Sequence, residues 1–120
     1  MIIYCDSSAL VKKYIEEENS QKVIEQLNQA ESIIISVIGY AEICSAFYRK
    51  KYQKEIHSSQ LTRILRAFED DWQAFVRVNV TDELNKTAKL LLSKHPLRGF
   101  DAIHLASAVL MHKKLEDKVY

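Results

Sequence analysis

Three acidic residues stand at positions that a purely structural role explains poorly: Asp6, Glu42 and Asp101. Asp6 directly follows a short apolar run, Glu42 lies in a stretch of otherwise apolar or small residues, and Asp101 opens an apolar segment. Carboxylates that converge repel one another unless a cation neutralises them. Ligation by oxygen alone suits Mg²⁺ or Mn²⁺, and such an ion activates water for attack on a phosphodiester. Together the three residues predict a metal-dependent catalytic cluster.

Each carboxylate also has an ordinary explanation. Asp6 can cap a helix, and Asp101 can complement a helix dipole, an effect of about 0.3–1 kcal/mol. Glu42 can rotate to the solvent edge of its helix. Against these explanations, Ser7 and Ser8 would cap a helix equally well without adding a charge. On the covered side of a helix Glu42 would need a cation, because glutamate is rarely buried unless it is paired.

Periodicity predicts the elements that must position these residues. Apolar and β-branched runs predict strands at residues 2–5, 32–36 and 75–80, and residues 118–120 open a fourth. Helical spacing of apolar residues, with polar residues that favour helix starts, predicts the helices between them. One of these helices follows the capping residues 6–8, one runs over residues 20–30, and the others begin at residues 37, 58, 81 and 101.

Strands that alternate with helices predict an α/β fold, with a central parallel sheet of at least three strands and helices on both faces. In such sheets, ligands bind beyond the carboxyl ends of the strands. Asp6, Glu42 and Asp101 should all face that rim.

Three segments resemble the motifs of PIN-domain ribonucleases, and most closely those of the VapC-type toxins of bacterial toxin–antitoxin modules. The segments are DSSAL at residues 6–10, YAEI at 40–43 and LRGFDAIHLA at 97–106. The resemblance implies an α/β/α sandwich, Mg²⁺- or Mn²⁺-dependent cleavage of RNA, frequent homodimers and inhibition by a small antitoxin protein. By position, Asp6, Glu42 and Asp101 match the metal-binding carboxylates, and Ser7 or Ser8 matches the residue that supports the first of them.

The chain departs from this family at its C-terminal end. Members usually continue through the fourth strand to another acidic residue, whereas this sequence stops at Tyr120. We therefore expect one domain over residues 1–120 with an incomplete final strand. Asp117 precedes that strand and should lie at the opposite edge of the sheet, so it is not expected to replace the missing ligand.

Basic residues are the candidates for contact with RNA phosphates. Seventeen Lys and Arg against sixteen Asp and Glu exclude a protein coated in positive charge. Arg98 stands beside the expected rim, and Arg49, Lys50 and Lys51 form the densest basic cluster, although each can equally be a solvated cation or a helix C-terminal cation. His104 follows Asp101 by three residues and is expected to pack or to form a hydrogen bond.

The sequence also bears on location. No apolar run approaches the ~20 residues of a membrane span, and an early Asp6 is unlike a signal peptide. We therefore expect a cytoplasmic protein that does not bind membranes, in which Cys5 and Cys44 are free and act as small apolar residues.

Two other functions remain open at this point. One is an Asp-based phosphoryl-transfer or phosphoacceptor domain, although Ser8 stands where an aspartyl-nucleophile phosphatase needs a second Asp. The other is a catalytically impaired domain of the same fold that serves only as an interaction module, which the missing fourth carboxylate favours.

Overall fold

A computed structural model describes residues 1–116 of the chain. The predicted fourth strand at 118–120 and Asp117 lie outside these residues. The elements, in chain order, are β1 (Ile2–Cys5), α1 (Ser7–Tyr14), α2 (Ser20–Asn28), β2 (Ser32–Ser36), α3 (Gly39–Tyr52), α4 (Ser58–Ala74), β3 (Val76–Val78), α5 (Asp82–Lys94) and α6 (Gly99–Glu116). No helix within residues 1–116 combines the length and apolar character needed to cross a bilayer.

The three strands form one parallel sheet in the order β1-β2-β3, with β2 in the centre. Ile3 pairs with Ile33, and Ile35 pairs with Arg77. The strand predicted at residues 32–36 is confirmed, since β2 has the same bounds. Its three β-branched residues suit a strand that is covered on both faces. The strand predicted at 75–80 is shorter than expected. Phe75 instead terminates α4, with its N–H donating to the carbonyl of Trp72 at 3.3 Å.

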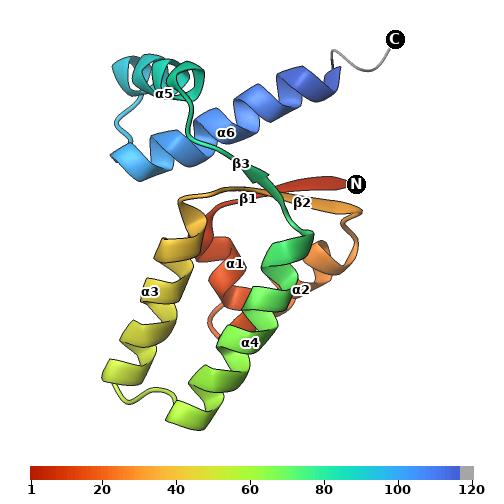
Figure 1. The fold of residues 1–120 in the computed structure, drawn as a ribbon, viewed down its shortest axis with the longest axis vertical. Helices are drawn as coiled ribbons and strands as arrows, with labels where there is room; N and C mark the ends of the chain where they lie inside the picture. The colour runs from red at the N-terminus through yellow and green to blue at the C-terminus, as the bar shows by residue number, and fades with distance from the viewer. Residues whose placement is uncertain (117–120) are drawn as a thin grey trace.

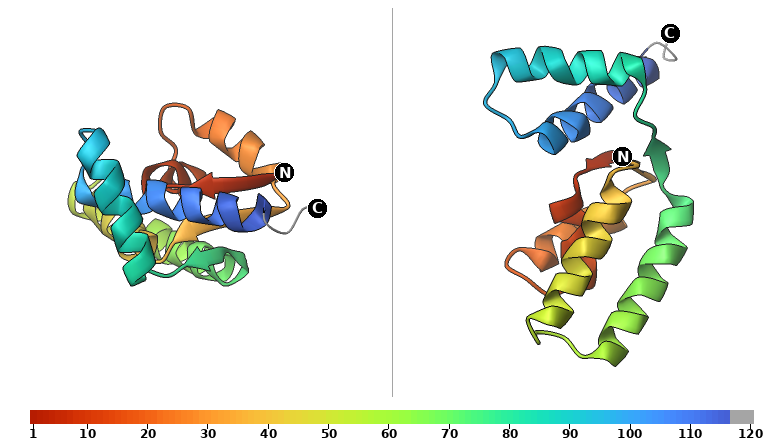
Figure 2. Two further views of the ribbon diagram at one scale, coloured as in Figure 1. Left: turned by 90° about the horizontal axis from the view of Figure 1, so that it is seen from above. Right: turned by 60° about the vertical axis from the view of Figure 1, so that its left-hand side comes forward.

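Helices cover both faces of the sheet, so the predicted three-layer α/β/α sandwich is confirmed (Figure 1). Helices α1–α4 lie on one side of the strands, and α5 and α6 lie on the other, as the two further views also show (Figure 2). Each side has its own apolar core. The larger core includes Leu10, Ile35, Ile43, Phe47 and Phe68. The smaller core consists of Leu84, Ala88, Ala102 and Ala106.

Local chemistry explains several of the helix boundaries. The hydroxyl of Thr81 accepts the N–H of Leu84 at 3.1 Å, so the predicted cap of α5 is confirmed. The prediction that α6 starts at Asp101 is wrong by two residues, because the carbonyl of Arg98 already accepts the N–H of Ala102 at 3.0 Å. Similarly, α3 begins at Gly39 rather than at residue 37, where the N–H of Val37 still bonds to β3.

The arrangement of helices and strands sets the position of the candidate site. In a parallel sheet, the carboxyl ends of all strands lie at one edge, and α1 and α3 begin there directly after β1 and β2. The first turn of α6 lies at the same edge (Figure 1). The starts of α1, α3 and α6 carry Asp6, Glu42 and Asp101, respectively.

Candidate active site

Asp6 serves as the N-cap of α1. Its Oδ1 accepts the N–H of Ala9 at 2.9 Å and the hydroxyl of Ser8 at 3.1 Å. Asp6 therefore does cap a helix, as its position after a strand allows. The cap satisfies an N–H group that the first helical turn leaves without a partner. The side chain is nevertheless exposed, and both hydrogen bonds fall on the same oxygen. Asp6 can therefore cap the helix and still present its second oxygen to a ligand.

Asp101 shares a surface hollow with Asp6. We call it the carboxylate hollow: it has a volume of about 320 Å³ and is lined by Tyr4, Cys5, Asp6, Leu97, Asp101, His104, Leu105 and Ala108. Asp101 lies in the first turn of α6 and is exposed. Two of the three predicted carboxylates, one from each side of the sheet, thus line the same hollow at its carboxyl edge.

Glu42 is held in a triangle of hydrogen bonds with Ser7 and His104. Its Oε1 accepts the hydroxyl of Ser7 at 2.6 Å and lies 2.7 Å from Nε2 of His104. Nε2 of His104 also lies 3.2 Å from Oγ of Ser7. The Glu42 side chain is 29% exposed and that of His104 is 10% exposed. Glu42 is therefore turned inward and paired, and the prediction that His104 forms a hydrogen bond is confirmed.

The partners of His104 define which ring nitrogen carries its proton. A carboxylate oxygen only accepts, so Nε2 must be the nitrogen that donates to Glu42. In the neutral ring Nδ1 is then an acceptor, and this atom is buried without a hydrogen-bond partner among residues 1–116. Among residues 1–116, the hydrogen bonds that orient the imidazole are therefore those of Nε2.

The two serines after Asp6 have different partners. Ser8 bonds to Asp6, as the resemblance implied for Ser7 or Ser8, whereas Ser7 is buried and bonds to Glu42 and His104. One residue turns a helix by about 100 degrees, so neighbouring serines at the start of α1 face different directions. The sequence could not predict that Ser7 bonds to Glu42, because Ser8 carries the same hydroxyl group at the neighbouring position.

The three carboxylates do not converge as closely as the sequence predicts. Within residues 1–116, no group of three or more His, Cys, Asp or Glu is placed to hold a metal ion. Asp6 and Asp101 share the carboxylate hollow, while Glu42 is bonded to His104, which lines that hollow. The oxygen atoms of the three carboxylates are suitable ligands for a hard divalent ion such as Mg²⁺ or Mn²⁺. Two of the three carboxylates line the carboxylate hollow.

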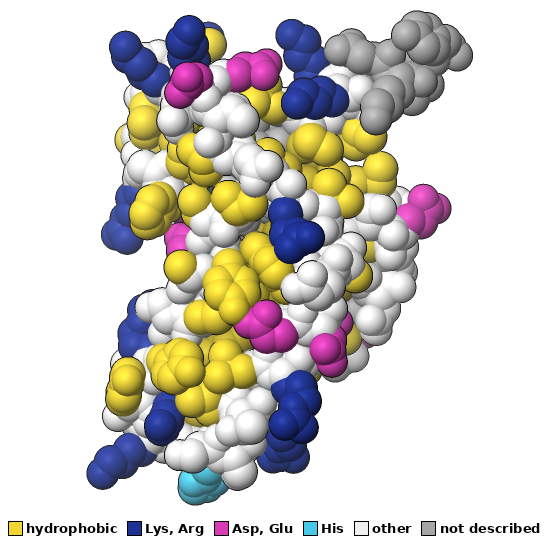
Figure 3. Space-filling model, in the orientation of Figure 1, with side chains coloured by type: hydrophobic (Ala, Val, Ile, Leu, Met, Phe, Trp, Pro, Cys, Tyr) yellow, Lys and Arg dark blue, Asp and Glu magenta, His cyan; other side chains and the backbone are white. Residues whose placement is uncertain are grey.

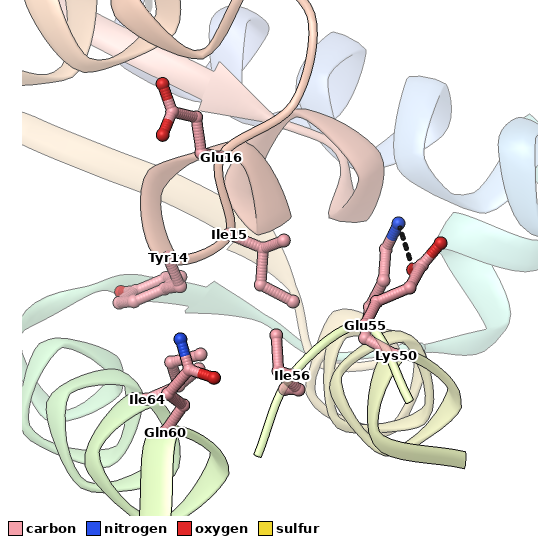
Figure 4. Close-up of a pocket in the computed structure, with 8 residues that line it drawn as sticks. All are labelled: Tyr14, Ile15, Glu16, Lys50, Glu55, Ile56, Gln60 and Ile64. Atoms are coloured by element: carbon pink, nitrogen blue, oxygen red, sulfur yellow. Dashed lines mark ion pairs between the residues drawn. The ribbon is translucent and has the colours of Figure 1, made fainter. Parts of the chain in front are cut away.

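The basic cluster proposed for RNA contact lies away from this hollow. Arg49, Lys50 and Lys51 occupy the last turn of α3, whereas the site lies at its first turn. Lys50 pairs with Glu55 at 3.0 Å beside a second hollow of about 370 Å³ (Figure 4), and the hydrogen bond to Glu55 raises the pKa of Lys50. Arg98 is exposed and directly precedes α6. On the face drawn in Figure 3, Lys and Arg are scattered and hydrophobic side chains gather over α3 and α4.

The two cysteines are free and half-buried. Burial, reinforced by the negative charge of Asp6, raises the pKa of Cys5 to about 11. Burial and the nearby Glu69 likewise raise the pKa of Cys44. Both shifts disfavour the thiolate, which is the reactive form, so neither cysteine is a candidate nucleophile.

Comparison with known proteins adds an independent observation. The family model described as "PIN domain" matches residues 3–115. Two curated relatives from Mycobacterium tuberculosis, Ribonuclease VapC45 (strain CDC 1551 / Oshkosh) and Ribonuclease VapC49 (strain ATCC 25618 / H37Rv), are each 32% identical to this chain over 108 residues. The alignment spans 90% of this chain and 75% of either relative.

Two solved structures share the fold. A toxin-antitoxin complex from Klebsiella pneumoniae superposes with a TM-score of 0.64 at 22% identity, covering 92% of this chain and 79% of that one. Mycobacterium tuberculosis VapC20, a toxin that cleaves the sarcin-ricin loop, superposes with a TM-score of 0.68 at 16% identity, covering 95% and 83%. At these identities the two structures support the architecture.

Proposed function

The chain belongs to the PIN domain family, and from that premise we propose that it is a metal-dependent endoribonuclease, the toxin of a toxin–antitoxin pair. The observation that carries the proposal is the carboxylate hollow, which is lined by Asp6 and Asp101 from opposite sides of the sheet. Glu42 lies one hydrogen bond from His104 of the same hollow.

In this proposal, Asp6, Glu42 and Asp101 hold Mg²⁺ or Mn²⁺. When bound, the ion supplies a metal-activated water and positive charge for the scissile phosphate. The exposure of Asp6 and Asp101 leaves both carboxylates accessible to solvent and substrate. The negative charge of these carboxylates would repel a phosphodiester. The site can therefore bind RNA only when a cation is also bound.

Contact with the RNA backbone is proposed for Arg98 in preference to the cluster at the end of α3. Arg98 adjoins Leu97, which lines the carboxylate hollow, whereas Lys50 is already paired with Glu55. Arg49 and Lys51 lie on the same distant turn as Lys50. They remain candidates only for RNA that extends along α3.

A small antitoxin protein is the proposed partner. The support is that the curated relatives are VapC ribonucleases and that a structure of the same fold is a toxin–antitoxin complex. A homodimer stays a prediction from the family resemblance. Light scattering coupled to size-exclusion chromatography measures it directly, and a monomer mass would contradict it.

The test is a nuclease assay on purified protein with a structured RNA, in Mg²⁺, in Mn²⁺ and in EDTA. We expect cleavage with either metal, none in EDTA, and none for Asp6→Asn or Asp101→Asn. Asp82→Asn is the matched control, since Asp82 is an exposed acidic residue in the first turn of α5. Cleavage by Asp101→Asn at the parent rate would overturn the proposal.

One observation favours the non-catalytic alternative, an interaction domain on the PIN fold. Within residues 1–116, three metal ligands do not converge on one point. Calorimetric titration with Mn²⁺ separates the two functions. A ribonuclease must bind the ion through Asp6 and Asp101, whereas an interaction domain need not bind it.

A further inference from the structure

The triangle of Ser7, Glu42 and His104 joins three elements that lie far apart in the chain. Ser7 belongs to α1, Glu42 to α3 and His104 to α6. Its hydrogen bonds connect residues separated by 35, 97 and 62 positions. Because α1 and α3 lie on one side of the sheet and α6 on the other, the triangle also connects the two helical layers (Figure 1).

His104 is poorly suited to a purely packing role at this position. Its side chain is 10% exposed, and Nδ1 is buried without a hydrogen-bond partner among residues 1–116. An unpaired buried polar atom costs stability that an apolar side chain of similar size would avoid. The stabilising contact of the ring is therefore the one made by Nε2 with Glu42.

Both hydrogen bonds of Glu42 fall on Oε1. They restrict the rotation of the carboxylate and leave Oε2 outside the triangle. Carboxylates that bind metals are generally oriented by such partners, and removal of a partner typically lowers metal affinity or activity about 10–100-fold.

We propose that His104, assisted by Ser7, is a positioning residue that fixes Oε1 of Glu42 so that Oε2 is the oxygen available to a divalent ion. This inference rests on the proposed function, and it adds that the ligand from α3 is oriented by α6. The required feature is a donor at the place of Nε2. The charge of the ring is not required.

Three variants of one residue test the proposal. His104→Gln places its amide nitrogen near the position of Nε2, His104→Asn places it near Nδ1, and His104→Leu has no donor. His95→Gln is the control, because His95 is exposed at the end of α5. Three measurements apply to each protein: the Mn²⁺ concentration that gives half of the maximal rise in melting temperature, kcat and KM for RNA, and urea unfolding in EDTA.

We expect His104→Leu and His104→Asn to need about 10–100-fold more Mn²⁺ and to lose kcat with little change in KM. In EDTA, His104→Leu should unfold at a urea concentration close to that of the parent, because the loss of the Nε2 bond to Glu42 and the loss of the unpaired Nδ1 change stability in opposite directions. His104→Gln should bind Mn²⁺ close to the parent concentration, and Ser7→Ala should weaken binding in the same direction as His104→Leu.

Opposite results would overturn the positioning role and leave the proposed function standing. One is parental Mn²⁺ binding and kcat in His104→Leu while Asp101→Asn has lost both. Another is a His104→Gln variant as impaired as His104→Leu, since the donor at Nε2 would then not matter. A parent protein that neither binds Mn²⁺ nor cuts RNA would instead refute the proposed function, and the positioning role with it.

Discussion

The phenol of Tyr14 donates a hydrogen bond to Oδ2 of Asp71 at 2.6 Å, across 57 positions of sequence. Lys13 forms an ion pair with the same oxygen at 2.7 Å, so two consecutive residues of α1 bind one carboxylate of α4. The ring of Tyr14 packs edge-on against Phe47 and Phe68, with centroids at 5.6 and 5.7 Å. This contact anchors α1 on the larger core.

The Tyr14 contact makes stability depend on pH. Burial and the hydrogen bond to Asp71 raise the pKa of Tyr14. The folded protein therefore keeps a proton that the unfolded chain loses above about pH 10, and the free energy of unfolding must fall as the pH rises past that point. Tyr14→Phe should flatten this alkaline decline and cost about 1.5–3 kcal/mol at pH 7 for the lost bond to a charged group.

Urea titrations between pH 7 and pH 11 measure this effect. Tyr52→Phe is the control, because Tyr52 is 75% exposed. Part of the decline should persist in both variants, since the hydrogen bond to Glu69 raises the pKa of Tyr40 to about 12. Identical pH profiles for the parent and Tyr14→Phe would contradict the assignment.

Two substitutions of Asp6 should separate its cap from its charge. Asn caps a helix as well as Asp does, whereas Ala removes the acceptor of the Ala9 N–H and costs about 0.5–2 kcal/mol. We expect Asp6→Asn to keep the parental free energy of unfolding and Asp6→Ala to lose that amount, while neither variant cuts RNA. An Asp6→Asn protein that is as unstable as Asp6→Ala would show that the charge itself, and not the cap, stabilises α1.

Gly39 is required for close packing at the start of α3. An added Cβ would lie 2.8 Å from Cδ1 of Ile35 and 3.3 Å from Oγ of Ser7. Ile35 is 1% exposed and cannot move into solvent, so Gly39→Ala should cost about 1–3 kcal/mol by overpacking. The same substitution at Gly99 meets nothing within 4 Å and should not destabilise the protein. Thermal melts of the two variants, at equal concentration, check the difference.

Phe47 is the central aromatic residue of the larger core. Its side chain is fully buried and packs edge-on against Tyr14 and Phe68. Phe47→Ala should therefore lower the free energy of unfolding by about 3–5 kcal/mol. Phe100→Ala, at a position 62% exposed, should change it little. If urea denaturation finds equal losses in the two variants, Phe47 does not have this role in the core.

Much of the fold could be predicted from local pattern. The run Ser32–Ser36 is both the predicted and the observed strand, because three consecutive β-branched residues suit a pleated strand that is packed on its faces. The start of α5 was predictable as well, since a threonine hydroxyl before two acidic residues satisfies the first turn from within the same few residues. Such features depend only on residues that are close in the sequence, so they can be predicted without the tertiary structure.

The candidate site was predictable only in part. The positions of Asp6, Glu42 and Asp101 at the starts of helices place them at one edge of a parallel sheet, as the topology requires. The direction of each side chain was not predictable, because it depends on how the helices are rotated about their axes when they pack.

By itself, the sequence determined the alternation of strands and helices, the edge at which the acidic residues gather and the family to which the chain belongs. Only the tertiary structure decided that Ser7 rather than Ser8 reaches Glu42, and that His104 completes the triangle. The reason is physical: periodicity acts over a few residues, whereas hydrogen bonds across 35 to 97 positions exist only after three helices have packed at the end of one sheet.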